Sequence, residues 1–137
     1  MKISVIGLGK LGFPMAKFLK KFNFEVSAYD INQKLCEELK KNDKKYLSSE
    51  VGINKYKKKI KIFNSIQECL FNTDITYITV PTPSLRNGKF SNKLLLNVLD
   101  NICSFIKTKS KKNPHIININ STVSPGSFEE ELIPFME

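Results

Sequence analysis

Hydrophobic and polar positions along the chain follow two different periods in alternation. Short apolar or alternating runs are typical of strands in a largely buried sheet, and apolar residues that recur every three or four positions are typical of one helix face. The short runs predict strands at residues 3–7, 24–30, 60–64, 74–81 and 115–120. The longer spacing predicts helices at residues 11–22, about 32–41, 66–71 and 93–107, and a last helix within 121–136.

Each helical pattern also predicts which side faces the core. In the first helix the expected inward positions are Leu11, Met15, Phe18, Leu19 and Phe22. In the helix at 93–107 they form one stripe, made of Leu95, Leu96, Leu99, Ile102, Cys103 and Ile106. Both patterns indicate amphipathic helices that cover a sheet.

Polar residues mark the ends of the elements and the connections between them. Ser65 and Asn92 precede helical patterns and are placed to cap them, while Asn87 and Gly88 predict a turn. Residues 42–59 are polar and have no sustained period. We therefore expect an irregular connection there, with a short helix near Asn54.

The order of the elements predicts the fold class. Strands and helices alternate along the chain, which favours a parallel sheet whose crossover helices cover both faces. We expect an α/β chain with a Rossmann-like, doubly wound parallel sheet. At 137 residues the chain has the length of one domain, so residues 1–137 are expected to fold as a single unit.

The first predicted strand ends in a glycine-rich turn, GLGKLG. Gly7 stands at the strand end, Gly9 where a side chain would block a bound phosphate, and Gly12 where the helix packs close to the sheet. Asp30 ends the next predicted strand 18 residues after Gly12, close to the spacing of a carboxylate that accepts from a ribose 2′-OH. The pattern predicts a dinucleotide site. The alternative is a glycine-rich turn with an incidental acid.

Asp30 also favours one dinucleotide over the other. The 2′-phosphate of NADP would face this carboxylate as a like charge, with no arginine beside it. The predicted cofactor is therefore NAD. Lys34, one helical turn further on, is the residue that could offset the repulsion.

Two more predicted strands end in unusual turns. Thr82 lies between two prolines in VPTPS, and Ser121 and Thr122 follow the last strand in NSTVSPGS. Because ligands of parallel sheets bind outside the carboxyl ends of the strands, these hydroxyl groups are candidates for contact with a ligand. The alternative interpretation of each turn is a proline-containing loop with capping hydroxyl groups.

Composition narrows the classes of partner. The net charge of +9 is carried almost entirely by lysine, with Arg86 as the single arginine, whereas interfaces that read bases rely on arginine and aromatic side chains. The lysine-rich tracts at 55–61 and 107–112 are interpreted as solvated faces, so no nucleic-acid partner is predicted. No run approaches the ~18 apolar residues of a membrane span, and no membrane partner is predicted.

The cysteines do not form a recognisable framework. Cys36, Cys69 and Cys103 are widely separated, and an odd number without C-x-x-C spacing argues against both disulfides and a zinc site. We expect partly or fully buried free thiols in a reducing, cytoplasmic compartment, and no metal.

Taken together, four motifs resemble one family. The chain resembles the nucleotide-sugar dehydrogenases, the UDP-glucose and GDP-mannose 6-dehydrogenase family, over essentially its whole length. The motifs that carry the resemblance are GLGKLGFPMA, VPTPS, NGKFSNK and NSTVSPGS. The resemblance extends to EVGI, where Glu50 stands at a position of the family's Glu-Pro-Gly-Leu motif and Val51 replaces the proline.

The resemblance implies an activity and places the adenosine end of the cofactor. Members of the family oxidise the C6 alcohol of a UDP- or GDP-sugar to a carboxylate in two NAD-dependent steps, through a thiohemiacetal on a catalytic cysteine, in polysaccharide biosynthesis. By resemblance, Asp30 and Lys34 would contact the adenosine ribose. The backbone around Lys10 and Leu11 would hold the pyrophosphate, next to Gly7, Gly9 and Gly12.

The resemblance also implies what this stretch of chain lacks. Thr82 would lie along the cofactor, and Thr122 would reach the nicotinamide and help to position the catalytic water. None of Cys36, Cys69 and Cys103 lies in a motif like that of the family's nucleophile, which belongs to a middle or C-terminal domain. The chain is thus expected to be the NAD-binding domain of a homodimeric enzyme and to be inactive alone.

Two other functions remain open at this point. The NAD(P)-binding domains of 3-hydroxyisobutyrate and 6-phosphogluconate dehydrogenases share a similar glycine-rich opening and a later serine-threonine turn. They usually lack the V-P-T-P turn. A non-catalytic Rossmann module that senses a nucleotide would use the same site to shift an equilibrium with a partner.

Overall fold

The computed structural model describes residues 1–49, 60–108 and 114–137, and for residues 42–49 it describes the backbone alone. Glu50, the short helix predicted near Asn54, and most of both lysine-rich tracts lie outside the described residues.

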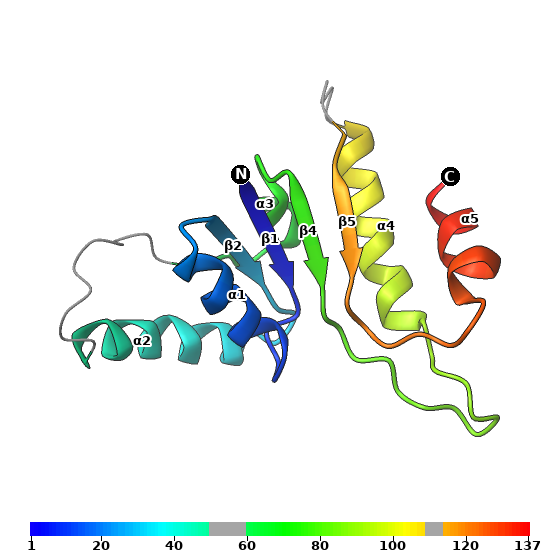
Figure 1. The fold of residues 1–137 in the computed structure, drawn as a ribbon, viewed down its shortest axis with the longest axis horizontal. Helices are drawn as coiled ribbons and strands as arrows, with labels where there is room; N and C mark the ends of the chain where they lie inside the picture. Colours follow the sequence, from blue (N-terminus) through cyan, green and yellow to red (C-terminus); the bar gives the residue numbers. More distant parts are fainter. Residues whose placement is uncertain (50–59, 109–113) are drawn as a thin grey trace.

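The described residues contain a parallel sheet of five strands (Figure 1). The strands are β1 (Lys2–Ile6), β2 (Glu25–Tyr29), β3 (Lys61–Ile62), β4 (Ile75–Ile78) and β5 (Ile116–Ile119). Their order is β3-β2-β1-β4-β5, and all four pairings are parallel. The sheet therefore reverses its winding direction between β1 and β4, and the predicted doubly wound fold is confirmed.

Helices connect the strands and cover the sheet. They are α1 (Gly12–Lys21), α2 (Gln33–Ser49), α3 (Ile66–Leu70) and α4 (Lys93–Thr108), followed by a π-helical turn, η1 (Phe128–Leu132), that runs into α5 (Ile133–Met136). No helix among the described residues has the length and the apolar character needed to cross a membrane.

Two hydrophobic cores lie on opposite faces of the sheet. On one face Val5 packs with Ala16 of α1 and Cys36 of α2. On the other, the next residue of β1, Ile6, packs in the cluster that contains Leu99 of α4. Adjacent residues of a strand point to opposite faces, so β1 is buried on both sides, as its apolar run predicts. Five of the six residues in the predicted stripe of α4 lie in or against this second core, and Cys103 is half-buried outside it.

The predicted inward face of α1 is largely wrong, although Leu19 packs against the first core. Three of the five expected core side chains are exposed: Leu11 at 57%, Phe18 at 61% and Phe22 at 59%. The buried residues of α1 are the small ones, Gly12 and Ala16. Small residues let the helix approach the sheet closely, and this contact outweighs the larger apolar stripe, whose Phe18 and Phe22 rings pack on each other at 4.8 Å.

The length of α2 also differs from the prediction. The helix was expected to end near residue 41, where the apolar period stops, but it continues to Ser49. Residues 42–49 contain neither glycine nor proline, so no residue of this stretch breaks the helix.

One of the two predicted caps is confirmed. The Ser65 side chain accepts a hydrogen bond from the Glu68 N–H at 3.2 Å at the start of α3. The Asn92 side chain does not cap α4: its buried Oδ1 has no hydrogen-bond partner, and its Nδ2 donates to Glu131 Oε2 at 2.7 Å. Asn92 contributes only its backbone carbonyl, which accepts from the Leu96 N–H at 2.8 Å. A contact with η1 thus replaces the expected local bond.

Candidate cofactor site

The turn between β1 and α1 needs two of its glycines for the fold itself. Gly7 has φ +94°, and a Cβ there would lie 2.6 Å from the Thr79 carbonyl oxygen. A Cβ at Gly12 would collide with the carbonyl oxygen of Gly7 and with Thr79 Oγ1. The close approach of α1 to the sheet, predicted from the sequence, is therefore present.

Gly9 differs from these two glycines. A Cβ at Gly9 would meet no atom within 4 Å, and its φ lies outside the left-handed range. Packing thus does not require a glycine here. The open space above Gly9 borders the cavity described below, where a side chain would occupy the path of a ligand.

The carboxylate of Asp30 is held by two backbone groups. Asp30 Oδ2 accepts from the Leu8 N–H at 2.7 Å, and Oδ1 accepts from the Asn32 N–H at 2.8 Å. The first bond joins the end of β2 to the glycine turn that follows β1. Each carboxylate oxygen keeps a further lone pair for a ligand hydroxyl group.

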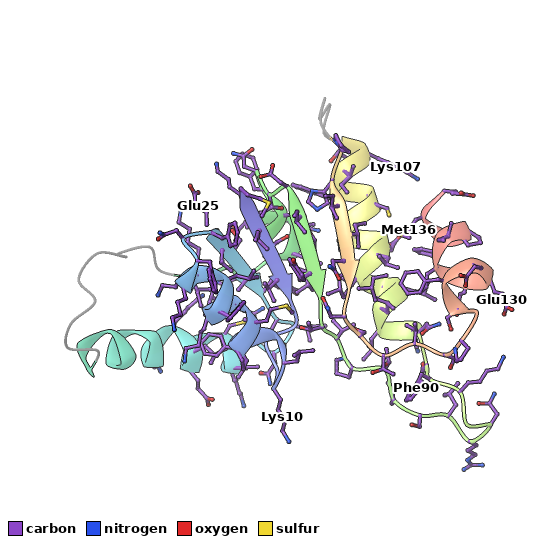
Figure 2. The ribbon with its side chains drawn as sticks, viewed as in Figure 1. Lys10, Glu25, Phe90, Lys107, Glu130 and Met136 are labelled. Atoms are coloured by element: carbon purple, nitrogen blue, oxygen red, sulfur yellow. The ribbon has the colours of Figure 1, made fainter. Side chains whose placement is uncertain are left out.

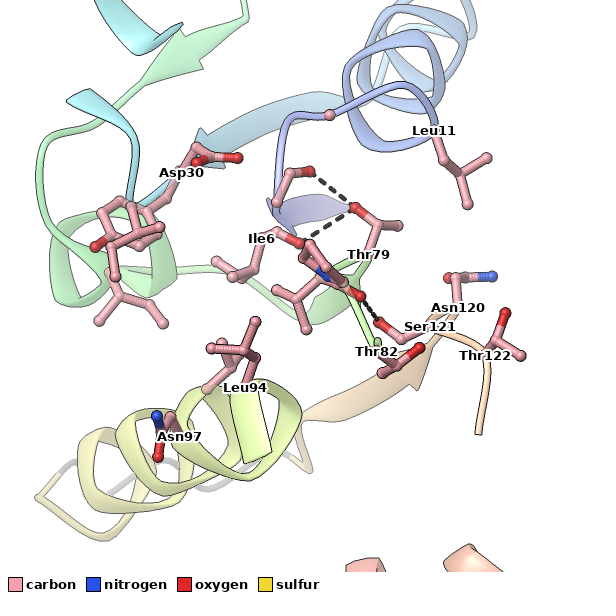
Figure 3. Close-up of a pocket in the computed structure, with 18 of the residues that line it drawn as sticks. Ile6, Leu11, Asp30, Thr79, Thr82, Leu94, Asn97, Asn120, Ser121 and Thr122 are labelled. Atoms are coloured by element: carbon pink, nitrogen blue, oxygen red, sulfur yellow. Dashed lines mark hydrogen bonds between the residues drawn. The ribbon is translucent and has the colours of Figure 1, made fainter. Parts of the chain in front are cut away.

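Thr79 fixes the glycine turn from the neighbouring strand. Its Oγ1 donates to the Gly7 carbonyl oxygen at 2.8 Å and lies 3.3 Å from that of Ile6 (Figure 3). Thr79 was not predicted as a site residue, because a threonine at the end of a strand is common and gives no signal of its own. Its role follows only from the parallel pairing of β1 with β4.

The two later turns are joined to each other. Ser121 Oγ donates to the Val80 carbonyl oxygen at 2.8 Å, which ties the end of β5 to the end of β4 (Figure 3). Thr122, the next residue, is exposed, and Thr82 is half-buried. Both threonines line the cavity. Ser121 lines it too, and its hydrogen bond in addition joins the two turns.

All three turns open into one cavity of about 630 Å³ at the carboxyl ends of the strands. Eight predicted residues line it: Gly7, Gly9, Lys10, Leu11, Asp30, Thr82, Ser121 and Thr122. Gly12 and Lys34 are not among the lining residues; Gly12 is buried behind Gly7 and Lys34 is exposed. The Lys10 side chain extends from the turn into solvent (Figure 2).

The cavity continues past Asp30 to residues that the sequence analysis missed. Ile31 and Ile66 line this part together with Leu94, Asn97 and other residues of α4. The α4 pattern was interpreted only as a core stripe, so its cavity side was overlooked. Asparagines at positions 97 and 101, one turn apart in a helix, were the available signal, because asparagine is a weak helix former.

The cysteines stand apart from this cavity. None of Cys36, Cys69 and Cys103 is among its lining residues, and all three are free thiols. Desolvation by burial raises the pKa of each thiol, most strongly that of Cys69. They are therefore protonated at neutral pH and poor nucleophiles. The described residues contain no group of three or more His, Cys, Asp or Glu side chains that could hold a metal ion.

The features of the cavity fit a dinucleotide. No side chain caps the N-terminus of α1, whose first turn follows the open Gly9, and this arrangement leaves N–H groups and a positive helix end for a pyrophosphate. The Asp30 carboxylate stands at the end of β2, where Rossmann folds place the acid that binds the adenosine ribose. Fold and site together define a dinucleotide-binding domain of the Rossmann class.

Comparison with known proteins specifies the family. The chain belongs to the UDP-glucose/GDP-mannose dehydrogenase family, and residues 1–137 match its NAD-binding domain. The chain is 33% identical over 135 residues to protein CapL of Staphylococcus aureus, covering 98% of this chain and 30% of CapL. It is 30% identical over 145 aligned positions to the GDP-mannose 6-dehydrogenase of Pseudomonas syringae pv. syringae, covering 100% of this chain and 32% of that enzyme.

A solved structure agrees with this assignment in its fold. The crystal structure of a ternary complex of GDP-mannose dehydrogenase from Pseudomonas aeruginosa superposes with a TM-score of 0.83 at 24% identity, over 100% of this chain and 32% of that one. This chain spans about a third of the length of the curated relatives named above, 30% and 32%. The resemblance stated from the sequence is confirmed, and the cofactor of the domain is NAD.

Proposed function

We propose that this chain serves as the NAD-binding domain of a nucleotide-sugar 6-dehydrogenase. The reaction would oxidise the C6 alcohol of a UDP- or GDP-sugar to a carboxylate in two NAD-dependent steps. The observation that carries this proposal is the convergence of three turns on one cavity: the glycine turn, the V-P-T-P turn with Thr82 and the turn with Thr122. Matching over residues 1–137 to the family supports it.

The proposed roles at the adenosine end follow from the hydrogen bonds of the free site. Asp30 would accept from the ribose 2′-OH with lone pairs that Leu8 and Asn32 leave unused. The backbone from Gly9 to Leu11 would donate to the pyrophosphate at the start of α1. We propose that Lys34 approaches the same ribose from α2, although it does not line the cavity.

The other end of the cavity would hold the nicotinamide. NAD, when bound there, supplies the acceptor for the hydride. Thr82 would lie along the cofactor, and the exposed Thr122 would orient the nicotinamide and a water molecule. Both hydroxyl groups are held on turns tied together by the bond between Ser121 and Val80, so little ordering is needed when a ligand binds.

The remaining chemistry is proposed to lie outside these residues. The three thiols are absent from the cavity lining and hold their protons, so none of them suits the role of nucleophile. We propose that the nucleophile and most of the sugar-nucleotide site belong to middle and C-terminal domains, that the whole enzyme is a cytoplasmic homodimer, and that it supplies sugar acids for polysaccharide biosynthesis. No nucleic acid or membrane takes part in this proposal.

A domain exchange tests the proposal. Residues 1–137 replace the matching domain of the Pseudomonas syringae GDP-mannose 6-dehydrogenase, and NADH formation is followed at 340 nm with GDP-mannose. The expected result is NAD reduction that depends on GDP-mannose, and none by residues 1–137 alone. A chimera that binds both NADH and GDP-mannose but forms no NADH would contradict the proposed function, as would turnover by residues 1–137 alone.

A further inference from the structure

The cavity has an apolar end that the glycine turn and the threonines do not explain. Its lining near Asp30 includes Ile31, the next residue along the chain, and Leu94 of α4. Both side chains are exposed, Ile31 at 85% and Leu94 at 43%. Large apolar side chains that line an open cavity and are exposed to solvent offer a slot that a flat, apolar group would cover.

The order of groups in a dinucleotide determines what enters this slot. The pyrophosphate lies at Gly9 and the adenosine ribose at Asp30, so the adenine extends past Asp30, away from Thr82 and Thr122. Figure 3 shows Leu94 and Asn97 on α4 at the same end of the cavity as Asp30, with Thr122 at the other end. This step rests on the proposed placement of NAD.

Two asparagines border the slot, and the structure distinguishes them. Asn97 and Asn101 both line the cavity, one turn apart on α4. Asn101 Nδ2 donates to the Asn97 carbonyl oxygen at 2.7 Å, which ties that carboxamide back to its own helix. Asn97 is exposed and lines the cavity. It is therefore the one of the two that can turn both of its polar atoms to a ligand.

A carboxamide is complementary to the edge of adenine. Adenine presents the N6 amino group, a donor, beside a ring nitrogen acceptor, N1 on one edge and N7 on the other. Asn97 offers Oδ1 as the acceptor and Nδ2 as the donor, so it can make both bonds at once. A purely apolar slot would hold a flat base without such bonds, whereas a slot with this amide adds two hydrogen bonds when adenine is bound.

We propose that Asn97 is a specificity-determining residue that recognises the adenine of NAD through paired hydrogen bonds to N6 and a ring nitrogen. Ile31 and Leu94 sandwich the base, and Asn97 reads its edge. The role explains why α4 carries a weak helix former on its cavity side.

The test compares NAD with 1,N6-etheno-NAD, in which a ring joins N1 and N6 and removes the N6–H donors. Because the donor is lost from both edges, no rotation of the carboxamide restores two bonds. Dissociation constants of both dinucleotides are measured by calorimetry on the chain and on Asn97→Ala and Asn101→Ala. Asn101→Ala is the matched control, with the same residue type on the same helix face.

We expect the chain to bind NAD roughly tenfold or more tightly than etheno-NAD, with the bulk of the added ring contributing part of this preference. In Asn97→Ala the preference falls about fivefold or more, mainly through weaker NAD binding, and in Asn101→Ala it stays unchanged. An equal preference in the chain and in Asn97→Ala would overturn the inference while leaving the proposed function intact. A loss of preference only in Asn101→Ala would also overturn it. Failure of the chain to bind NAD would overturn both.

Discussion

Asp30 Oδ2 and the backbone N–H of Leu8 are joined by a 2.7 Å hydrogen bond between the end of β2 and the turn that follows β1. Asp30, which is proposed to bind the adenosine ribose, is thus held by the glycine turn, which is proposed to bind the pyrophosphate. One side chain therefore contributes both to the shape of the site and to its choice of ligand.

Substitution of Asp30 should separate these two contributions. Asp30→Ala leaves the N–H groups of Leu8 and Asn32 without their acceptor, so we expect a loss of about 1–3 kcal/mol in the free energy of unfolding together with weaker NAD binding. Asp30→Asn keeps one acceptor but loses the charge. It should unfold at a denaturant concentration nearer to the parent's while discriminating less against NADP.

Chemical denaturation and calorimetric titration of both variants check this prediction. An NAD/NADP affinity ratio that stays at the parent value in both variants would remove Asp30 from the ribose site.

The glycines should divide into two groups. Gly12→Ala places a methyl group against the Gly7 carbonyl oxygen and Thr79, so it should destabilise the domain by more than about 2 kcal/mol. Gly9→Ala enters open space and should leave the melting temperature unchanged or slightly raised while NAD binding falls about tenfold or more. Thermal melts and calorimetry of the two variants measure both quantities. A stable Gly9→Ala variant with parental NAD affinity would show that the pyrophosphate does not pass over Gly9.

Thr79 should act through the glycine turn. Thr79→Val keeps the shape of the side chain and removes the bond to the Gly7 carbonyl oxygen, so we expect about 1 kcal/mol lower stability and weaker NAD binding. Thr79→Ser retains the hydroxyl group and should restore NAD affinity to near the parent value. If serine and valine lower the affinity equally, the hydroxyl group has no role in positioning the turn.

The thiols should make stability depend on alkaline pH. Burial raises the pKa of Cys69, so the folded chain holds this proton at pH values where the unfolded chain releases it. The stability that this proton contributes is complete below the unfolded thiol pKa of about 8.5 and declines as the pH rises above it. Urea unfolding at pH 7.5 and 9.5 should show lower stability at the higher pH, with a smaller decrease in Cys69→Ala. An equal decrease in both proteins would contradict the role assigned to Cys69.

The sequence predicted the fold because each strand and helix carries its own period and the order of elements leaves few topologies. It also predicted a glycine turn after β1 and an acid at the end of β2, and Gly7, Gly9 and Asp30 all line the cavity. The predictions failed where a contact with a residue distant in the sequence determines which side chain is buried or bonded. Ala16 rather than Phe18 faces the sheet, since helix-to-sheet distance selects the small residue. Asn92 bonds to Glu131 instead of capping α4. Asn97 was not predicted as a site residue, because the pattern of α4 was interpreted only as a face that packs on the core.

The central claim, that this chain is an NAD-binding domain whose acid selects NAD, is tested most directly by calorimetric titration of residues 1–137 with NAD and with NADP under identical conditions. The predicted result is saturable, one-to-one binding of NAD and roughly tenfold or weaker binding of NADP, because the 2′-phosphate would face Asp30 as a like charge. Equal affinity for the two dinucleotides, or no binding of NAD, would contradict the account.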